Sequence, residues 1–295
     1  MKPVAIAMPG NERLTDELAV VLGLERGAAT VRRFPDGESH VRIETPVEGR
    51  HAIIVCTLDR PDDKLVALML LACAVREAGA LSVGLVAPYL AYMRQDRRFQ
   101  PGETVSARHV AGWISRHVDW LVTVDPHLHR IADLSEVYGV PSRVAHAAEG
   151  IASWVRANVR QPLLIGPDEE SAQWVSDVAR QADAPFVVLT KIRRGDHDVE
   201  VSVPERDRWR SHTPVLIDDI VSTARTMIAA VTQMRHTGLA APFCVAVHAV
   251  FAQTAFEDLR AAGAADIVSC DTISHPSNRI ALAPAIAACV REFLP

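Results

Sequence analysis

Short apolar runs alternate with longer amphipathic stretches along the whole chain. The runs have the length of strands and little polar alternation, and they cover residues 4–8, 51–56, 82–87, 120–124, 163–165, 186–189, 215–217, 243–250 and 266–269. Apolar positions recur at helical spacing in the stretches 12–22, 62–78, 105–117, 147–159, 169–181, 226–236, 254–261 and 281–293. Apolar strands separated by helices are typical of parallel sheets covered on both faces. The pattern therefore predicts an α/β fold.

The series of strands and helices starts again near residue 145. This restart predicts two similar α/β domains, 1–145 and 146–280, each with a mostly parallel sheet flanked by helices. The last stretch, 281–295, follows a long loop and is expected to pack back on the first domain. Ligands of such sheets bind beyond the carboxyl ends of the strands. The loops after residues 87, 124, 165, 189 and 217 are therefore the candidate binding segments.

The segment 214–226 carries the densest set of candidate chemistry. An apolar run ends in Asp218 and Asp219, and a turn with Ser222 and Thr223 then leads into a helix. Free backbone N–H groups at a helix N-terminus, with the positive end of the helix dipole, favour a phosphate group. The two carboxylates can reach sugar hydroxyls or a hydrated Mg²⁺. The alternative is that one of these residues only caps the helix.

This segment resembles the 5-phosphoribosyl-1-diphosphate (PRPP) loop of type I phosphoribosyltransferases and of PRPP synthases. The resemblance implies that both domains have the type I phosphoribosyltransferase fold. It also implies a ribose 5-phosphate site made by residues of this loop, namely Asp218, Asp219, Ser222, Thr223, Ala224, Arg225 and Thr226. Ser222 replaces the acid of many members, and Arg225 stands where glycine is usual. Arg225 could contact a phosphate or crowd the turn.

The loop after residue 87 distinguishes between those two groups of proteins. It places Arg94, Gln95, Asp96 and Arg97 between aromatic residues. Such a set suits a nucleotide, with guanidinium groups on phosphate and rings against a base, although a solvated basic loop is the alternative. The segment resembles the Y-x-R-Q-D-R-[KR] … G-E-x-[IV]-S region of ribose-phosphate diphosphokinases (PRPP synthases), which phosphoribosyltransferases lack. The resemblance implies that these four residues bind ATP.

Two further strand ends match motifs of the same family. Asp125 and His127 match V-D-x-H, which implies that His127 lies at the Mg–nucleotide site, whereas a lone histidine here is more often a hydrogen-bonded surface residue. Asp168 matches a P-D motif, which implies a role at a metal and ribose site, whereas helix capping would also explain an acid at this point. The chain departs there from the common form P-D-x-G-G.

Two expected hairpins complete the set of motifs. Lys191 and Arg193 match a K-x-R pair on a loop that closes over the reacting phosphates, whereas a basic hairpin tip is usually only solvated. Phe34, Asp36 and Glu38 match F-x-[DN]-G-E in a segment that otherwise looks like an ordinary turn. The resemblance implies that these three residues hold adenine in the ATP site of a neighbouring subunit. The protein is therefore expected to be a homo-oligomer, at least a dimer.

Composition limits the range of partners. The 295 residues suffice for two cores, and 49% hydrophobic with 23% charged residues is typical of a soluble globular protein. The net charge of −5 argues against nucleic acid or an anionic membrane as the main partner. The longest apolar run, 65–75, is too short to span a bilayer, and the five cysteines show no metal-ligand spacing. We expect a cytoplasmic protein with reduced cysteines.

The motifs together identify the chain as a member of the PRPP synthase family, and they look closer to archaeal-type members. Membership implies transfer of the β,γ-diphosphoryl group of ATP to the C1 hydroxyl of ribose 5-phosphate, which gives PRPP and AMP. It implies Mg²⁺ near His127 and Asp168, and stabilisation of developing charge by Lys191 and Arg193. One alternative is a non-catalytic PRPP-synthase-like regulatory subunit, for which Arg225 is the best argument. The other is a type I phosphoribosyltransferase, which the ATP-type loops disfavour.

Overall fold

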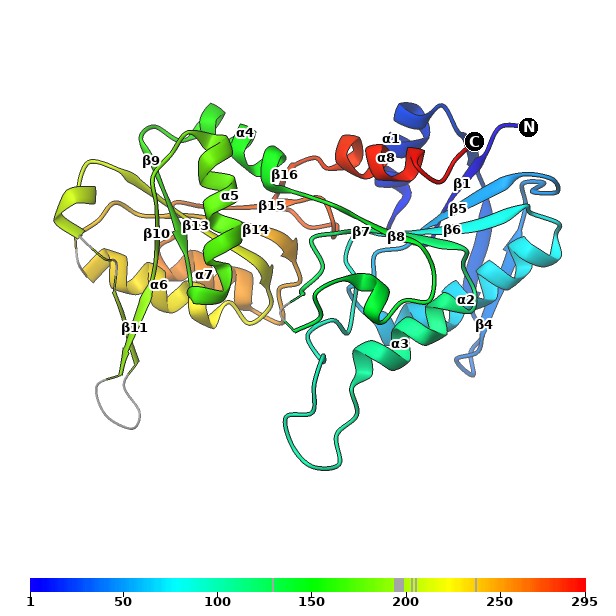
Figure 1. Cartoon of the computed structure of the whole chain (residues 1–295), viewed down its shortest axis with the longest axis horizontal. Coiled ribbons are helices and arrows are strands. Elements are labelled where there is room, and N and C mark those ends of the chain that lie inside the picture. The colour runs from blue at the N-terminus through cyan, green and yellow to red at the C-terminus, as the bar shows by residue number, and fades with distance from the viewer. Residues whose placement is uncertain (129, 194–198, 203, 205, 237) are drawn as a thin grey trace. The chain divides into compact units, whose positions relative to one another are not determined.

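The chain folds into two compact units. The computed structural model describes residues 1–128, 130–193, 199–202, 204, 206–236 and 238–295. The first unit comprises Met1–His146, Thr272–Ser274 and Ala283–Pro295, and the second comprises Ala147–Asp271 and His275–Leu282. The chain thus returns from the second unit to the first twice. Each unit contains one parallel sheet flanked by helices, which confirms the predicted fold class (Figure 1).

The first unit is built on a six-stranded sheet of order β2-β1-β5-β6-β7-β8, in which every pairing is parallel. Its strands are β1 (Val4–Ala7), β2 (Glu25–Gly27), β5 (His51–Val55), β6 (Ser82–Ala87), β7 (Trp120–Val124) and β8 (Ser142–Ala145). Helices α1 (Glu12–Leu22) and α8 (Ala283–Arg291) cover one face, and α2 (Pro61–Glu77) and α3 (Ser106–Ser115) cover the other (Figure 1). The central strands are fully covered, which explains their continuous apolar sequence.

The second unit repeats this plan with a sheet of order β10-β9-β13-β14-β15-β16, again parallel throughout. Its strands are β9 (Pro162–Gly166), β10 (Phe186–Val188), β13 (Thr213–Val221), β14 (Phe243–Ala249), β15 (Asp266–Cys270) and β16 (Asn278–Ile280). Helices α4 (Ala148–Asn158) and α5 (Ala172–Ala182) lie on one face, and α6 (Arg225–His236) and α7 (Ala255–Ala262) lie on the other.

An antiparallel hairpin is inserted at the same point of each unit, after the second strand of its sheet. In the first unit, β3 (Ala29–Arg33) pairs with β4 (Ser39–Ile43). In the second, β11 (Thr190–Arg193) pairs with β12 (Val199–Ser202). The equal strand order and the equal place of the hairpin make the two units structural repeats.

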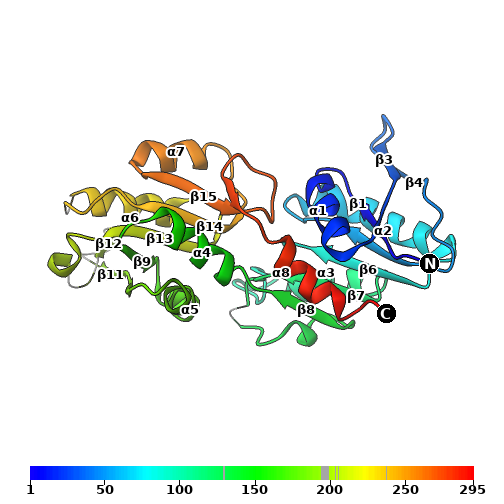
Figure 2. The same ribbon diagram turned by 90° about the horizontal axis from the view of Figure 1, so that it is seen from above.

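Helix α8 returns the C-terminus to the first unit. It lies across β7 and β8 beside α1 (Figure 2). The Phe293 ring stacks on Trp120 with a centroid distance of 4.8 Å and an interplanar angle of 5°. Arg143 of β8 pairs with Glu292 at 2.6 Å. Gly84 gives the Trp120 ring its room, because a Cβ on Gly84 would lie 2.0 Å from Trp120 Cζ2.

Some element boundaries differ from those that the sequence predicts. β13 does not end at Ile217 but continues to Val221, because its pairing with β14 goes on through Asp218↔Ala246 and Val221↔Ala249. Asp218 and Asp219 therefore lie in a strand rather than in a loop. The helix expected from residue 169 begins as a 3₁₀ turn, η2 (Glu169–Ser171), before α5. Strands β2, β8 and β16 were not predicted.

Three of the five cysteines, Cys56, Cys244 and Cys270, are buried. All five cysteines are free thiols, and burial raises the pKa of Cys56 and of Cys244 to about 12. Such thiols stay protonated and unreactive. Among the helices of the described residues, none is long and apolar enough to cross a membrane.

Candidate active site

In each sheet, one pair of neighbouring strands is followed by helices that lie on opposite faces of the sheet. In the first unit these strands are β1 and β5, which are followed by α1 and α2. In the second unit they are β9 and β13, which are followed by α5 and α6. Ligands of open parallel sheets bind in the crevice beyond the carboxyl ends of such a pair.

The turn after β13 has the geometry of a phosphate site. Only residues 222–224 connect β13 to α6, and the next segment holds this turn, since Phe251 N donates to Val221 O at 2.9 Å and Ala252 N donates to Ser222 O at 3.0 Å. Ile228 N donates to Ala224 O at 2.8 Å as α6 begins. The N–H groups just before Ile228 precede the first hydrogen bond within the helix. They can therefore donate to an external acceptor such as a phosphate.

Ala224 rather than Arg225 takes the unusual backbone conformation of this turn. Ala224 has a φ of 54°, in the left-handed region, and its side chain is buried. Arg225 is exposed and begins α6 with ordinary helical geometry. Arg225 therefore does not crowd the turn, and its guanidinium group stands at the helix end that favours anions.

The two carboxylates of β13 are half-buried and close to one another. Asp219 N donates to Asp218 Oδ1 at 3.0 Å, and Ile220 N donates to Asp219 Oδ1 at 2.7 Å. Burial, and then repulsion from Asp219 and more weakly from Asp168, raises the pKa of Asp218 well above its ordinary value. A bound divalent cation would relieve this repulsion.

Asp168 follows β9 and faces the same crevice edge of the second unit. It caps η2 in a reciprocal capping box, in which Ser171 N donates to Asp168 Oδ1 at 3.2 Å and Asp168 N donates to Ser171 Oγ at 3.4 Å. Gly166 is required beside this cap, because a Cβ there would lie 2.5 Å from Ser171 Oγ. The capping role is therefore real, and it coexists with the electrostatic effect of Asp168 on Asp218.

The described residues contain no cluster of three or more His, Cys, Asp or Glu side chains arranged to hold a metal ion. Mg²⁺ does not need one, because it is usually held by one or two carboxylates together with water and substrate phosphates. Carboxylates that repel one another beside a helix N-terminus suit such a hydrated ion. The second unit therefore offers residues that fit Mg²⁺.

In the first unit, the basic loop after β6 is anchored at several points. Ser106 Oγ donates to Gln95 Oε1 at 2.6 Å, and Ala107 N donates to Gln95 O at 3.3 Å. The Asp96 side chain is only 1% exposed and pairs with Arg130 at 3.2 Å. Asp96 thus fixes the loop from within.

Other residues of this loop face outward. Arg94 and Arg97 are exposed, and the Arg97 guanidinium lies 4.9 Å from the centre of the Phe99 ring. The hydroxyl of Tyr92 donates to Asp62 of α2, and this bond raises the pKa of Tyr92. An anchored loop whose guanidinium groups are exposed to solvent can bind a polyphosphate.

The loop after β7 lies beside the basic loop, because β6 and β7 are neighbours in the sheet. Asp125 is nearly buried, and its Oδ1 lies 2.8 Å from His146 Nδ1. His127 is half-buried in the same loop. The carboxylate of Asp125 is thus held by a protein partner.

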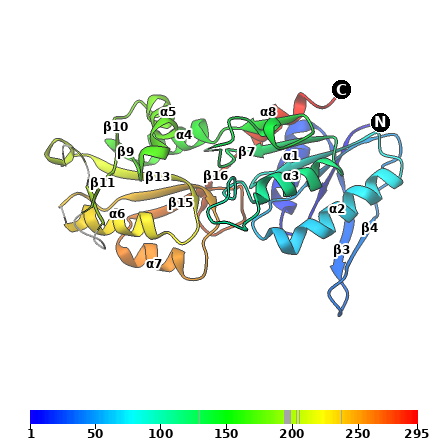
Figure 3. The same ribbon diagram turned by 60° about the horizontal axis from the view of Figure 1, so that its bottom comes forward.

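The β3–β4 hairpin carries Phe34, Asp36 and Glu38 at its tip and projects away from the sheet of its unit (Figure 3). The turn is closed by Phe34 N, which donates to Glu38 O at 2.8 Å, and by Glu38 N, which donates to Asp36 Oδ1 at 3.2 Å. The Phe34 ring is 37% exposed and lies between the Arg32 guanidinium, at 4.5 Å, and the His40 ring, at 5.6 Å. Phe34 is thus partly exposed at the tip and contacts two side chains of its own hairpin.

A cavity of about 320 Å³ lies at the root of this hairpin, between β3 and the first turn of α2. Its lining includes Arg32, Arg33 and Lys64. Arg33 already pairs with Asp63, and Lys64 already pairs with Asp59. The Arg32 guanidinium lies over the Phe34 ring, and we assign no ligand to this cavity.

Left-handed backbone marks three of the candidate loops. Tyr92 has a φ of 66°, Asp125 of 29° and Ala224 of 54°. This conformation costs roughly 1–2 kcal/mol for a residue with a Cβ. Such strain persists where the surroundings fix it, and it gathers at functional sites.

Comparison with known proteins shows the family of the chain. Residues 4–117 match the family model of the N-terminal domain of ribose phosphate pyrophosphokinase, and residues 135–283 match that of the phosphoribosyl transferase domain. A ribose-phosphate pyrophosphokinase of Methanopyrus kandleri is 34% identical over 98% of this chain and 99% of its own length. The chain belongs to the ribose-phosphate pyrophosphokinase family. The family predicted from the motifs is therefore confirmed.

Two further relatives support the assignment to the ribose-phosphate pyrophosphokinases. The enzyme so named from Halobacterium salinarum is 34% identical over 94% of this chain and 96% of its own, and that from Saccharolobus solfataricus is 30% identical over 92% and 93%. The crystal structure of phosphoribosylpyrophosphate synthetase from Mycobacterium smegmatis has a TM-score of 0.86 and covers 99% of both chains at 22% identity. That likeness establishes the common fold.

In this ribose-phosphate pyrophosphokinase fold, the motif residues fall into separate groups. The second unit brings together Asp168, the acidic pair of β13 and the turn 222–226 at one crevice. The first unit places the 94–97 loop and His127 at neighbouring strand ends. The hairpin tip 34–38 projects away from the sheet of the first unit. Lys191 and Arg193 lie on the backbone of β11, and their side chains are outside what the structure describes.

Several partners in these sites were not identified from the sequence. Arg130 holds Asp96, Asp62 holds Tyr92, and Thr57 joins the carboxyl ends of two strands. Each partner lies more than 25 residues from the residue that it contacts, and no motif spacing marks it. The one usable signal was chemical, since Thr57 is a hydroxyl residue directly after an apolar strand.

Proposed function

We propose that this chain is a ribose-phosphate diphosphokinase, which transfers the β,γ-diphosphoryl group of ATP to the C1 hydroxyl of ribose 5-phosphate and releases AMP. The relationship to enzymes of that name along nearly the whole chain carries this proposal. Both units take part in that relationship, so the chain has an ATP-type loop and a PRPP-type loop. A phosphoribosyltransferase would need only the second.

The second unit is the proposed site of ribose 5-phosphate. The turn after β13 offers backbone N–H groups and the hydroxyls of Ser222, Thr223 and Thr226 to the 5-phosphate, with Ala224 shaping the turn and Arg225 adding a positive charge. Asp218 and Asp219 accept hydrogen bonds from sugar hydroxyls. The sugar is thereby oriented with its C1 hydroxyl toward the diphosphoryl donor.

The first unit is the proposed site of ATP. Arg94, Gln95 and Arg97 contact the nucleotide, and Asp96 keeps their loop in place through Arg130. The hairpin tip with Phe34, Asp36 and Glu38 completes the adenine site of a neighbouring copy, which requires at least a homodimer. A ring stacks on the base, and carboxylates accept hydrogen bonds from its amino group.

Transfer of a diphosphoryl group needs alignment and neutralised charge more than covalent help. In the first unit His127 would contribute to holding Mg²⁺, and in the second unit Asp168 and the acidic pair of β13 would do so. When bound, the ion neutralises part of the polyphosphate charge. Lys191 and Arg193 stabilise the charge that develops on the transferring group. Cytoplasmic location and the absence of nucleic-acid or membrane partners remain predictions from composition.

The reaction itself is the first test. Incubation with ATP, ribose 5-phosphate and Mg²⁺ should yield AMP and PRPP in equal amounts, and omission of Mg²⁺ should abolish both. Release of ADP would mean transfer of the γ-phosphoryl group and would contradict the assignment. Absence of any product, with ligand binding intact, would favour the non-catalytic subunit.

A further inference from the structure

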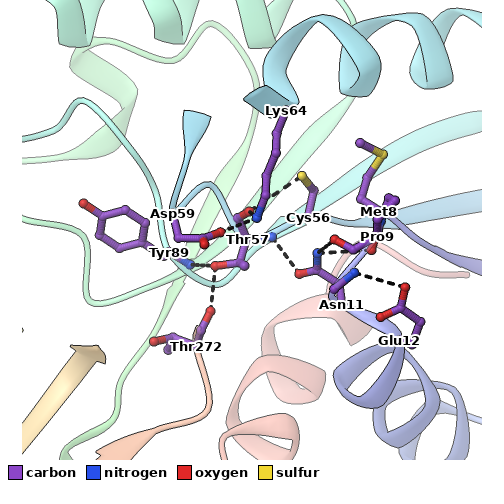
Figure 4. A network of polar contacts seen from close by, with 11 residues as sticks. Met8, Pro9, Asn11, Glu12, Cys56, Thr57, Asp59, Lys64, Tyr89 and Thr272 are labelled. Atoms are coloured by element: carbon purple, nitrogen blue, oxygen red, sulfur yellow. Dashed lines mark hydrogen bonds and ion pairs between the residues drawn. The ribbon is translucent and has the colours of Figure 1, made fainter. Parts of the chain in front are cut away.

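Thr57 joins four segments of the first unit at the crevice between β1 and β5. Its hydroxyl donates to Thr272 O at 2.6 Å and accepts from Tyr89 N at 3.3 Å. Its backbone N donates to Asn11 Oδ1 at 2.8 Å, and its carbonyl accepts from Lys64 Nζ at 2.9 Å (Figure 4). Thr57 is thus bonded through its hydroxyl, its amide and its carbonyl, and it is only 5% exposed.

Different residues lie at the corresponding crevice of the second unit. There the ends of β9 and β13 carry Asp168 and the turn of the proposed ribose 5-phosphate site. In the first unit, the segment Thr272–Ser274 enters from the second unit, and Thr272, only 1% exposed, places its carbonyl at this point. A piece of the chain itself therefore closes the crevice and supplies the acceptor for Thr57.

The Thr57 hydroxyl acts on the start of the ATP-type loop. Tyr89 follows β6 directly after Pro88, and the same loop continues to Arg94 and Arg97. Leu58 N donates to Tyr89 O at 3.0 Å, so residues 57 and 58 hold both backbone polar groups of Tyr89. This two-point contact fixes the direction in which the loop leaves the sheet.

The bond to Thr272 also determines how well Thr57 can hold Tyr89. A hydroxyl rotates until its single hydrogen meets an acceptor, and its lone pairs then point elsewhere. Because the Thr57 hydrogen is committed to Thr272 O, a lone pair is left to face the Tyr89 amide. The β-branched side chain further limits rotation about χ1.

We propose that Thr57 is a positioning residue for ATP, which acts through the Tyr89 amide and is itself oriented by Thr272. The inference rests on the proposed function, because it takes the loop that contains Arg94 to be the ATP loop. The rival interpretation is that the Thr57 hydroxyl only stabilises the fold. In that case its loss would lower the melting temperature without a selective effect on ATP.

Thr57→Val removes the hydroxyl and nearly keeps the shape, and Thr57→Ser keeps the hydroxyl. Thr123→Val is the matched control, because the buried Thr123 hydroxyl has no partner among the described residues. For Thr57→Val we expect the KM for ATP and the calorimetric Kd for ATP to rise about tenfold, or about 1.4 kcal/mol. The kcat and the KM for ribose 5-phosphate should change less than about threefold, because an interaction shared by ground and transition states affects binding alone.

Hydrogen exchange gives a readout that does not depend on activity. The Tyr89 amide should exchange about tenfold faster in Thr57→Val, because it has lost its buried acceptor, and at the wild-type rate in Thr57→Ser and Thr123→Val. Thr57→Ala replaces Thr57→Val if the latter does not fold. Wild-type ATP affinity with the hydroxyl removed would overturn the proposal, as would equal changes in both KM values. If the wild-type chain forms no AMP, the proposed function fails, and the ATP Kd of the variants still decides this inference.

Discussion

The backbone amide of Asp219 donates to Oδ1 of Asp218 at 3.0 Å, so two carboxylates that repel one another are held at consecutive positions of β13. The pairing of β13 with β14 includes Asp218 and Ile220, on either side of Asp219, and so keeps this stretch of backbone extended. A folded protein that keeps such a pair gives up stability at a site where a substrate or cation can restore it. Substitution in the acidic pair should therefore raise the stability of the ligand-free protein and weaken its activity.

The ligand-free protein should become more stable when Asp218 is replaced by Asn. The folded-state pKa of Asp218 is raised, so the folded chain holds this proton more tightly than the unfolded chain. The resulting stability is fully present below the ordinary pKa of 3.8 and is lost as the pH rises through the raised folded value. At pH 7, Asp218→Asn should melt a few degrees above wild type, and the gap should shrink in acid. Glu149→Gln, on the exposed face of α4, should show no such gap, and a lower melting temperature for Asp218→Asn at pH 7 would contradict the argument.

The same substitution should impair the use of ribose 5-phosphate more than the binding of ATP. Asn cannot accept as many hydrogen bonds from the sugar and cannot attract a cation. We expect the KM for ribose 5-phosphate to rise about tenfold or more, as for loss of a charged hydrogen bond of about 1.5–3 kcal/mol. Mg²⁺ should also raise the melting temperature of wild type more than that of Asp218→Asn. A defect confined to ATP would mean that the two substrate sites are exchanged.

All three strands that the sequence did not predict lie at sheet edges, although β10, which it did predict, is an edge strand as well. β6 and β7 lie in the interior and are apolar at nearly every position, so their bounds could be read from the sequence. β2 has the sequence Glu-Arg-Gly and lies at a sheet edge, where polar residues remain solvated. β16 is also an edge strand, and β8 another. Edge strands depend on pairing with a neighbour more than on their own apolar pattern.

Only part of the candidate site could be predicted from the sequence. The motif loops could be found from the sequence because they follow predicted strands and match a known family. The extension of β13 through Asp218 could not, since two adjacent acids resemble the start of a loop and only the partner strand keeps them extended. The burial of Asp96 against Arg130 depends on a contact 34 residues away. Local patterns thus selected the candidate residues, and tertiary contacts determined which of them are exposed and which are buried.

Lys191 and Arg193 should affect turnover rather than affinity. Both residues belong to the hairpin that the second unit inserts after its second strand, at the place where the first unit inserts the β3–β4 hairpin. If they act on charge that develops in the transition state, Lys191→Ala or Arg193→Ala should lower kcat far more than it changes the Kd for ATP. The loss of one such contact is worth roughly 3–4 kcal/mol, or on the order of a hundredfold or more in rate. Wild-type turnover in either variant would mean that this hairpin tip is only solvated and takes no part in the reaction.

Gly84→Ala should destabilise the first unit through its C-terminal helix. A Cβ at Gly84 would lie 2.0 Å from Trp120 Cζ2, and the Trp120 ring stacks on Phe293 beyond α8. The ring cannot move without breaking this stack, so we expect a loss of about 1–3 kcal/mol in the free energy of unfolding. Gly112→Ala in α3 is the control, because nothing lies within 4 Å of its Cβ and the change should stabilise the helix by about 0.5–1 kcal/mol. Equal denaturation midpoints for the two variants would show that the Trp120 ring moves aside without loss of stability.

Activity should require at least two copies of the chain, each lending its hairpin tip to the other. Phe34, Asp36 and Glu38 stand on a hairpin that projects away from the sheet carrying Arg94 and Arg97. Phe34→Ala/Glu38→Ala chains and Lys191→Ala/Arg193→Ala chains should each be inactive alone. Mixing them should restore part of the activity, because one site of a mixed dimer receives an intact hairpin tip from one chain and intact Lys191 and Arg193 from the other. Mixtures of either variant with itself are the control. No recovery from mixtures that demonstrably exchange subunits would place the whole adenine site within a single chain.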